Sequence, residues 1–418
     1  MANNKNTKVP NVPNSIDKGN TICNVPALRF PEFSGKWKKV RLGEECNMLC
    51  GYAFNGEDIV EQGSYLLMRG INITEGSIRH SSELDRYYSG SIEKLDKYKL
   101  AVGDLVIGMD GSKVGRNSAI VSSYEDGSYL VQRVCRIKSS IGNNYILQFI
   151  NNTKFHQYVD TVKTSSAIPH ISLRDIQNYR ISIPPTQNET DKIAKLFLLI
   201  DERIATQNKI IDDLKKLMSA ISKQVFAQKP NEWNRLDTLF SKGKAGGTPT
   251  STNKEYYNGE IPFLSINDIT KQGKYVQYTE NHLSQSGLEN SSAWVVPKYS
   301  LIMSMYASVG LVTINEIPIT TSQAMFAMQL KDKDLLDYLY YYLSYFKYRH
   351  IHKYLETGTQ SNINAEIVRG IMIPTYGHSR NMEISSTLQG IDVKIANELS
   401  VLRLFNRQKN YLLSQMFI

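Results

Sequence analysis

The sequence predicts an α+β protein in which two mixed α/β domains are separated by two long helices. We expect these helices to form an antiparallel coiled coil, in a pseudo-two-fold and near-circular arrangement. Two observations lead to this prediction. The chain of 418 residues contains an internal repeat of about 190 residues. Each copy joins short apolar runs, separated by glycine-rich turns, to a long segment of helical periodicity.

The repeat is visible as short matching segments, here called anchors, that occur in the same order in both halves of the chain. They are residues 37–40 with 233–236, 72–74 with 268–270, Gln132 with Gln323, 183–184 with 373–374, 200–204 with 391–395, and 222–226 with 413–417. Ordered anchors at a nearly constant spacing indicate a duplication, and a repeat of this kind decides the whole fold.

The first part of each copy is expected to be a mixed α/β domain. Residues 105–109 and 301–305 are apolar runs of strand length, and residues 334–354 have helical spacing. We divide the chain into a disordered N-terminal tail at 1–25, a first domain at 26–185, a central helix at 186–230, a second domain at 231–375 and a C-terminal helix at 376–418.

The second part of each copy is predicted to be a long helix with an apolar seam. The expected seam residues are Ile193, Leu196, Ile200, Ile210, Leu214, Leu217 and Ile221 in the first copy, and Ile384, Ile391, Val401, Phe405 and Leu412 in the second. Polar Arg203, Gln207 and Gln224 interrupt the seven-residue repeat of the first helix.

A helix of this length would extend roughly 55 Å, at about 1.5 Å per residue, so one domain cannot bury its seam. The other copy is the expected partner, in antiparallel orientation, which brings the end of the second helix near the beginning of the first domain. Two separate helices, each packed on its own domain, remain the alternative.

Composition restricts the class of protein. Lysine and arginine number 49 against 40 aspartates and glutamates, so the net charge of +9 permits a polyanionic partner. No apolar run approaches the roughly 20 residues of a membrane span, and residues 1–25 lack the apolar core of a signal peptide. The four cysteines form no CxxC pair, so we expect no disulfide framework or zinc site and a reducing cytoplasmic location, with no membrane partner.

Catalytic motifs are not found in the sequence. A phosphate-binding loop, a dinucleotide-binding GxGxxG after a strand and a metalloprotease HExxH are all missing. We therefore expect a binding protein without catalytic or metal-ligating residues. A basic, pseudo-symmetric protein with two unlike domains suits duplex DNA, and it would read an asymmetric, bipartite site with a fixed gap.

The candidate DNA-binding residues lie in polar, glycine-rich loops. In the first domain they are Arg69, Asn72, Lys113, Arg116, Arg133, Lys163, Thr164 and Ser165. In the second they are Ser265, Asn267, Lys271, Tyr306, Ser308, Gln323, Thr359, Gln360 and Asn362. Arginine pairs with guanine and asparagine or glutamine with adenine, whereas lysine, serine and threonine hold phosphates. For any single residue, an ordinary polar surface position remains the alternative.

Several motifs resemble those of a known family. They are Gly246-Gly247-Thr248-Pro249, the run 257–263, the run 357–363 ahead of Ile373-Pro374, and the entry segment 29–37. With the duplication and the two long helices, the chain resembles the specificity subunit of bacterial type I restriction-modification systems from about residue 25 to 418. The first domain departs from the pattern, with residues 50–54 and 164–171 in place of the two glycine motifs.

The resemblance implies two target recognition domains joined by helical regions that act as spacer and docking platform. Two methyltransferase subunits would bind this core and methylate adenine with S-adenosylmethionine, and two restriction subunits would add ATP- and Mg-dependent translocation and cleavage. The cofactors would belong to these partners, with none in this chain.

Two other functions remain open from the residues alone. A coiled-coil scaffold whose domains bind protein would not bind DNA even with its partners. A self-sufficient DNA enzyme with a disguised active site would methylate or cut DNA by itself.

Overall fold

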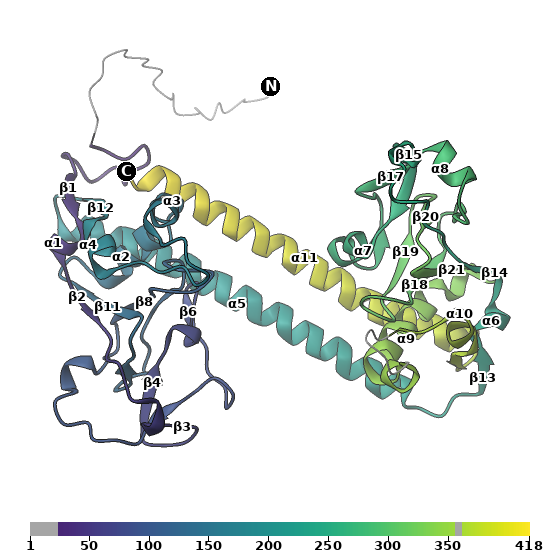
Figure 1. Cartoon of the computed structure of the whole chain (residues 1–418), viewed down its shortest axis with the longest axis horizontal. Helices are drawn as coiled ribbons and strands as arrows, with labels where there is room; N and C mark the ends of the chain where they lie inside the picture. The colour runs from purple at the N-terminus through teal and green to yellow at the C-terminus, as the bar shows by residue number, and fades with distance from the viewer. Residues whose placement is uncertain (1–23, 356–361) are drawn as a thin grey trace, which may run out of the picture. The chain divides into compact units, whose positions relative to one another are not determined.

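The computed structural model describes residues 24–355 and 362–418. Most of the predicted tail at 1–25 therefore lies outside the described residues, as do Thr359 and Gln360. The chain folds as two compact units, Met1–Ala205 with Arg403–Ile418 (unit 1) and Thr206–Leu402 (unit 2) (Figure 1). Each unit contains one mixed α/β domain and part of both long helices, so the predicted fold class is confirmed.

Unit 1 is built around a four-stranded antiparallel sheet in the order β2-β11-β8-β9. Its strands are β2 (Cys46–Cys50), β11 (Val134–Ser139), β8 (Leu105–Gly108) and β9 (Ser118–Ile120). A second sheet has the order β10-β4-β7-β3, from β10 (Tyr129–Leu130), β4 (Tyr65–Met68), β7 (Tyr87–Tyr88) and β3 (Ile59–Val60). The remaining strands and short α-helices are β1 (Lys38–Arg41), β12 (Arg180–Ile183), β5 (Ile73–Thr74), β6 (Ser77–Ile78), α1 (Leu42–Glu45), α2 (Asn143–Ile150), α3 (Thr153–Val162) and α4 (Leu173–Asn178).

Unit 2 repeats this plan with a five-stranded sheet in the order β14-β21-β18-β19-β16. Its strands are β14 (Phe240–Ala245), β21 (Met325–Leu330), β18 (Leu301–Ser304), β19 (Val312–Asn315) and β16 (Tyr275–Val276). The others are β13 (Glu232–Arg235), β22 (Met372–Thr375), β15 (Tyr257–Leu264), β17 (Asn281–Leu283), β20 (Thr320–Thr321), α6 (Leu236–Leu239), α7 (Ile266–Gln272), α8 (Gln285–Glu289), α9 (Leu336–Arg349) and α10 (Ala365–Gly370). The strands predicted at 105–109 and 301–305 are thus β8 and β18.

Strands β8 and β18, which lie inside the main sheets, begin with three apolar residues each, and all of these residues are buried. Leu105 and Ile107 of β8 join the core under α2, whereas Val106 between them joins a second core with Leu130 and Val134. Successive side chains of a strand point to opposite faces, so an unbroken apolar run is the pattern that a doubly covered strand requires. The main sheet therefore forms a rigid support with its loops at the ends of the strands.

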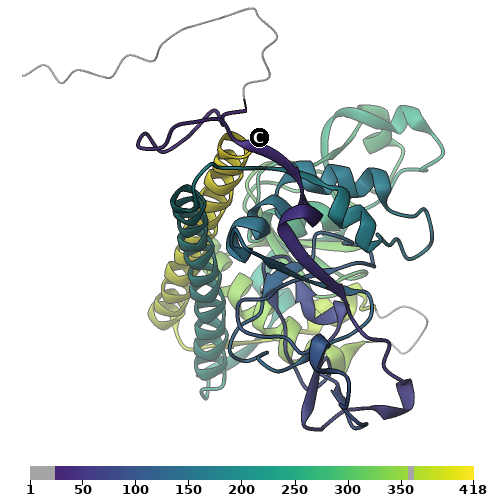
Figure 2. The ribbon, with the colours of Figure 1, turned by 90° about the vertical axis from the view of Figure 1, so that its left-hand side faces the viewer.

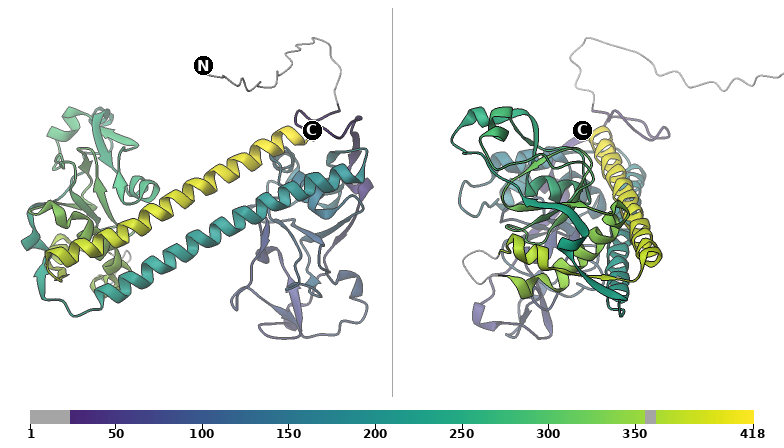
Figure 3. Two further views of the ribbon diagram at one scale, coloured as in Figure 1. Left: turned by 180° about the vertical axis from the view of Figure 1, so that it is seen from behind. Right: turned by 90° about the vertical axis from the view of Figure 1, so that its right-hand side faces the viewer.

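The long helices are α5 (Gln187–Phe226) and α11 (His378–Met416), and they run antiparallel within each unit. In unit 1 the Asp201 carboxylate lies 2.6 Å from the Lys409 ammonium, and the beginning of α5 lies beside the end of α11 (Figure 2). In unit 2 the Gln207 amide donates to the main-chain oxygen of Glu398 at 3.1 Å. The right-hand view of Figure 3 shows the ribbon of unit 2 from its own side. In this unit, Tyr342 and Tyr345 of α9 form ring contacts with Phe226 at the end of α5. The antiparallel pairing predicted from the repeat is confirmed within each unit.

The predicted seam of α5 is correct at Ile193, Leu196, Ile200, Leu214 and Ile221, which are buried or half-buried, and wrong at Ile210 and Leu217. Ile193 and Ile200 are buried as expected, but Ile210 and Leu217 are 40% and 48% exposed, while Ile211 is buried. Residues 193, 197, 200, 204, 207, 211, 214, 218, 221 and 225 are all buried or half-buried, and they follow a seven-residue repeat. From residue 204 onward, the second position of this repeat is one residue later than the sequence analysis placed it.

The seam of α11 shows the same mixture. Ile384 is buried as predicted, and Ile391, Val401, Phe405 and Leu412 are half-buried. Residues outside the prediction complete the seam, namely Leu388, Ile395, Leu413 and Met416, which are all buried.

The end of α11 closes unit 1 against the beginning of the described chain. The main-chain nitrogen of Leu28 donates to the oxygen of Gln415 at 3.0 Å, and the Asn152 amide donates to the oxygen of Leu413 at 3.2 Å. Phe417 packs its ring 4.7 Å from that of Phe149. The C-terminal helix thus completes the core of the first domain, as the near-circular prediction requires.

Within residues 24–355 and 362–418, none of the helices combines the length and the apolar character that crossing a membrane would need.

Candidate nucleic-acid interface

Four segments meet at one end of the main sheet in unit 1. The Met109 nitrogen donates to the oxygen of Arg133 at 2.9 Å, and the Ile171 nitrogen donates to the oxygen of Met109 at 3.0 Å. The Gly51 nitrogen donates to the oxygen of Val134 at 2.9 Å. These bonds join residues 50–54, 109–116, 131–134 and 163–171, which we call the unit 1 loop cluster.

The same arrangement occurs in unit 2. The Met305 nitrogen donates to the oxygen of Ala324 at 2.7 Å, and the Ile363 nitrogen donates to the oxygen of Met305 at 3.0 Å. The Gly246 nitrogen donates to the oxygen of Met325 at 3.1 Å. Residues 246–249, 305–310, 322–325 and 362–363 form the unit 2 loop cluster. Each bond has its counterpart in unit 1, so the duplication built the same loop framework twice.

Backbone strain is concentrated in these clusters. Arg133, Ala307 and Ser308 have φ values of 68°, 41° and 51°, in the left-handed region that side chains avoid. They are three of the six described non-glycine residues with positive φ. Strained conformations of this kind gather at functional sites, because the surrounding structure must hold them in place. The strain therefore marks the loop clusters as candidate binding surfaces.

Most of the predicted basic residues of unit 1 lie in or beside its loop cluster. Arg133 and Lys113 are exposed, and Arg69 follows β4, whose Met68 oxygen accepts from Val131 at 3.1 Å. Burial lowers the pKa of Arg69, and the nearby Arg86 charge acts in the same direction. Arg133 thus lies in the 131–134 turn, and Arg69 follows the strand to which this turn is hydrogen-bonded.

Acidic residues hold several of these cations. Asp160 on α3 lies 2.6 Å from the Lys163 ammonium and 2.9 Å from the Arg116 guanidinium. The Lys163 hydrogen bond lowers the pKa of Asp160, and Arg116 contributes to this effect. Lys113 pairs with Glu75 at 2.9 Å. Thr164 and Ser165 begin the adjacent loop, where the Thr164 nitrogen donates to the oxygen of His170 at 3.0 Å.

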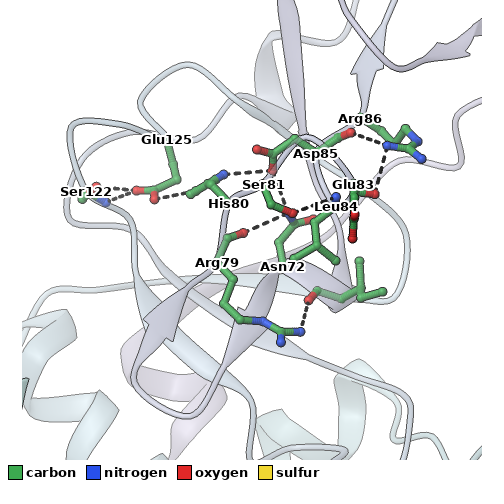
Figure 4. Close-up of polar contacts among 11 residues, drawn as sticks. Asn72, Arg79, His80, Ser81, Glu83, Leu84, Asp85, Arg86, Ser122 and Glu125 are labelled. Carbon is green, nitrogen blue, oxygen red and sulfur yellow. Dashed lines mark hydrogen bonds and ion pairs between the residues drawn. The ribbon is translucent and has the colours of Figure 1, made fainter. Parts of the chain in front are cut away.

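Asn72 is not available for base contacts in this structure, contrary to the sequence prediction. Its side chain is buried, and its amide donates to a carboxylate oxygen of Asp85 at 3.0 Å and to the oxygen of Arg79 at 3.2 Å (Figure 4). The same Asp85 oxygen lies 3.0 Å from the imidazole of His80, whose other nitrogen lies 2.9 Å from Glu125. Asn72 therefore helps to hold the loop that follows β4.

Hydrogen bonds compensate for most of the burial of the polar network in Figure 4, although the buried side-chain oxygen of Asn72 has no hydrogen-bond partner. Desolvation acts to raise the pKa of Glu125, but hydrogen bonds from Ser122 and His80 lower it overall. The Ser122 hydroxyl and main-chain nitrogen donate to this carboxylate at 2.6 and 2.7 Å. These hydrogen bonds among buried groups stabilise the conformation of the loop.

The predicted residues of unit 2 fall into two groups. Tyr306, Ser308 and Gln323 are exposed in the loop cluster and Asn362 is half-buried there, with the Gln323 amide oxygen accepting a hydrogen bond from the Thr248 hydroxyl. The other group, Ser265, Asn267 and Lys271, belongs to α7 and does not take part in the cluster's bonds.

The α7 group is held by acidic partners. Ser265 caps the helix through reciprocal bonds with Asp268, of which the hydroxyl-to-carboxylate bond is 2.7 Å long. The Asn267 amide donates to Glu280 at 3.0 Å, and Lys271 pairs with the same carboxylate, which raises the pKa of Lys271. In the structure, Ser265, Asn267 and Lys271 thus form hydrogen bonds or ion pairs with acidic residues of their own unit.

Gln132 is a candidate that the sequence-based set omitted. It is exposed at the second position of the 131–134 turn, and its nitrogen donates to the oxygen of Tyr52 at 2.8 Å. The signal was present in the sequence, because Gln132 is the anchor that pairs with Gln323 in the repeat.

Comparison with known proteins agrees with this duplicated framework. The family model for the type I restriction modification DNA specificity domain matches residues 34–216 and again residues 230–400. The chain belongs to this family. Its two matches cover the two repeats, so the resemblance found in the sequence is confirmed.

Individual relatives carry the same designation. The MjaIX type I restriction enzyme specificity subunit of Methanocaldococcus jannaschii is 26% identical over 175 residues, 40% of this chain and 40% of its own. The EcoAI type I restriction enzyme specificity subunit of Escherichia coli is 30% identical over 179 residues, 42% of this chain and 29% of its own. The chain thus matches less than half of the length of either relative.

Among solved structures, the S subunit of a type I restriction-modification system from M. genitalium has the same fold. Its TM-score is 0.60 at 14% sequence identity, with 94% of this chain and 99% of that one covered.

Proposed function

We propose that this chain is the DNA-binding specificity subunit of a type I restriction-modification complex. It recognises an asymmetric bipartite DNA site, with one half read by each loop cluster. The observation that carries this proposal is the construction of the same hydrogen-bonded loop cluster twice with different side chains. Two loop clusters with the same main-chain hydrogen bonds but different surface side chains support two DNA-recognition domains of different specificity.

The side chains of the two clusters favour different sequences. Unit 1 presents cations, with Arg133 and Lys113 exposed, whereas unit 2 presents the neutral Tyr306, Ser308 and Gln323. Arginine reads guanine through two hydrogen bonds, glutamine reads adenine in the same way, and lysine neutralises phosphate. The half-site of unit 1 is therefore expected to differ from that of unit 2.

We assign the target recognition domains to residues 26–185 and 231–375, and the spacer helices to 186–230 and 376–418. In this proposal the helices fix the gap between the half-sites and bind two methyltransferase subunits. Exposed apolar side chains support the docking role, because such residues mark protein interfaces. They include Leu199, Val393 and Leu404, which are 46%, 54% and 63% exposed.

The chain itself is proposed to be non-catalytic. Methylation with S-adenosylmethionine, and ATP- and Mg-dependent cleavage where two restriction subunits join, would take place in the partner subunits, in the cytoplasm. Catalysis by the partner subunits is consistent with the sequence analysis, which found no catalytic motif in this chain.

The decisive experiment combines methylation mapping with a domain exchange. The chain is co-expressed with the methyltransferase subunit encoded beside its gene, and modified bases are located by sequencing native DNA. We expect one bipartite motif, and exchange of residues 231–375 for another recognition domain should change one half only. A contiguous motif, a change in both halves, or methylation by the chain alone would contradict the proposal.

A further inference from the structure

We propose that Gln132 and Gln323 are matched base-reading residues, each forming two hydrogen bonds with an adenine in its own half-site. This inference rests on the proposed function and adds to it a specific pair of contacts. It starts from the position that the two residues occupy in the loop clusters.

Both glutamines occupy the second position of a four-residue turn. The first turn is closed by the bond from the Val134 nitrogen to the Val131 oxygen, at 3.2 Å. The second is closed by the bond from the Met325 nitrogen to the Ser322 oxygen, at 3.1 Å. A residue at this position lies at the corner of the turn, and both glutamines are exposed there.

Strands on both sides fix the two turns in place. The first turn joins β10 to β11, and β11 is paired with β2 and β8. The second joins β20 to β21, which is paired with β14 and β18. A side chain that must meet one base edge needs such a rigid base, because loose positioning forfeits the geometry of a bidentate contact.

The amide groups are available at the surface. Both residues are exposed, and the Gln132 side chain forms no hydrogen bond with any other residue of the described ranges 24–355 and 362–418. The Gln323 oxygen accepts from the Thr248 hydroxyl, which orients the amide while the oxygen keeps a second lone pair. An amide can accept from the N6 group of adenine and donate to N7 at the same time.

The neighbours of the two glutamines argue against an ordinary surface role. The flanking residues differ in the two turns, with Val131 and Arg133 around Gln132 but Ser322 and Ala324 around Gln323. The amide is the side chain that the two turns share after their divergence. A common function of the amide accounts for this, and recognition of the same base at an equivalent position of each half-site is the chemistry that fits.

The test uses the full chain in complex with its methyltransferase subunit, and its readout is the set of methylated sequences in native DNA. We expect adenine at one position of each half-site to depend on these residues. Gln132→Ala should lower discrimination for adenine there about 10- to 100-fold in one half only, and Gln323→Ala should do the same in the other half. Gln62→Ala, at an exposed glutamine outside the loop cluster, is the matched control and should change nothing.

The outcomes separate this inference from the proposed function. A wild-type motif that is not bipartite overturns the proposed function itself. A bipartite motif that both variants leave unchanged overturns only the inference. Relaxation at a base other than adenine also overturns it, as does uniform weakening on all sequences, which would indicate contacts with phosphates. Circular dichroism of each variant confirms that the fold is retained.

Discussion

A buried carboxylate joins the first turn of α5 to the segment that precedes β1, and its removal should destabilise unit 1. Glu189 is fully buried and accepts hydrogen bonds from Arg29 at 2.6 and 2.7 Å and from the Trp37 indole at 3.2 Å. Arg29 also donates to the main-chain oxygens of Gly35 and Ser34. The carboxylate thus ties the entry of the long helix to the first strand of the domain.

Glu189→Ala leaves the Arg29 guanidinium and the Trp37 indole without their acceptor. Breaking a buried ion pair costs about 3–5 kcal/mol. We expect about 3 kcal/mol, the lower end of this range, because Arg29 keeps its two main-chain acceptors. The double variant Arg29→Met with Glu189→Leu should recover most of this loss, since an apolar pair replaces both charges.

Urea-dependent hydrogen exchange, followed by mass spectrometry, measures the loss because it reports the free energy of opening for unit 1 and unit 2 separately. Glu32→Ala is the control, since Glu32 pairs with Lys192 at the surface and its removal should change little. A loss below about 1 kcal/mol in the Glu189→Ala variant, or an equal loss in unit 2, would refute the reasoning.

Three further predictions concern the helix seam, a thiol and the binding surface. Ile211→Ala should destabilise unit 2 by about 2–5 kcal/mol and Ile210→Ala by much less, measured by the same exchange assay; equal losses would contradict the revised seam. The neighbouring Cys135 thiol lowers the pKa of Cys50 to about 7, so alkylation of Cys50, followed by mass spectrometry, should be half-maximal near pH 7. A midpoint near the ordinary value of 9 would contradict this effect of Cys135 on Cys50. Arg133→Gly, which tolerates the left-handed backbone, should keep the unfolding midpoint but weaken DNA binding by the complex about tenfold or more in filter binding; unchanged affinity would remove Arg133 from the interface.

The sequence predicted the pairing of the long helices but misplaced part of their seam for a physical reason. Ile210 and Ile211 are adjacent and equally apolar, so the pattern alone allows either to face the partner helix. A seven-residue repeat drifts slowly around a helix of 3.6 residues per turn, and only packing selects the side that becomes buried. In the structure Ile211 is buried and Ile210 is exposed. Gln207, four residues earlier, and Leu214, three residues later, lie on the same side of the helix as Ile211 and are buried or half-buried.

The binding residues were harder to predict because polar side chains look alike in a sequence. Asn72 was chosen as an exposed amide, yet Asp85 and Arg79 bind it internally, and no spacing rule relates these three residues. Gln132 was left out although its repeat partner Gln323 was included. In a duplicated chain, equivalence between the copies therefore identifies candidate residues that residue type alone does not.

Photo-crosslinking tests most directly whether each loop cluster reads its own half-site. A photoreactive amino acid is placed at Arg133 in one variant and at Tyr306 in another, and each complex with the methyltransferase subunit is irradiated on its methylated DNA. The account predicts that the two probes react with opposite halves of the site. Crosslinks from both positions to the same half, or none to DNA from either, would contradict it.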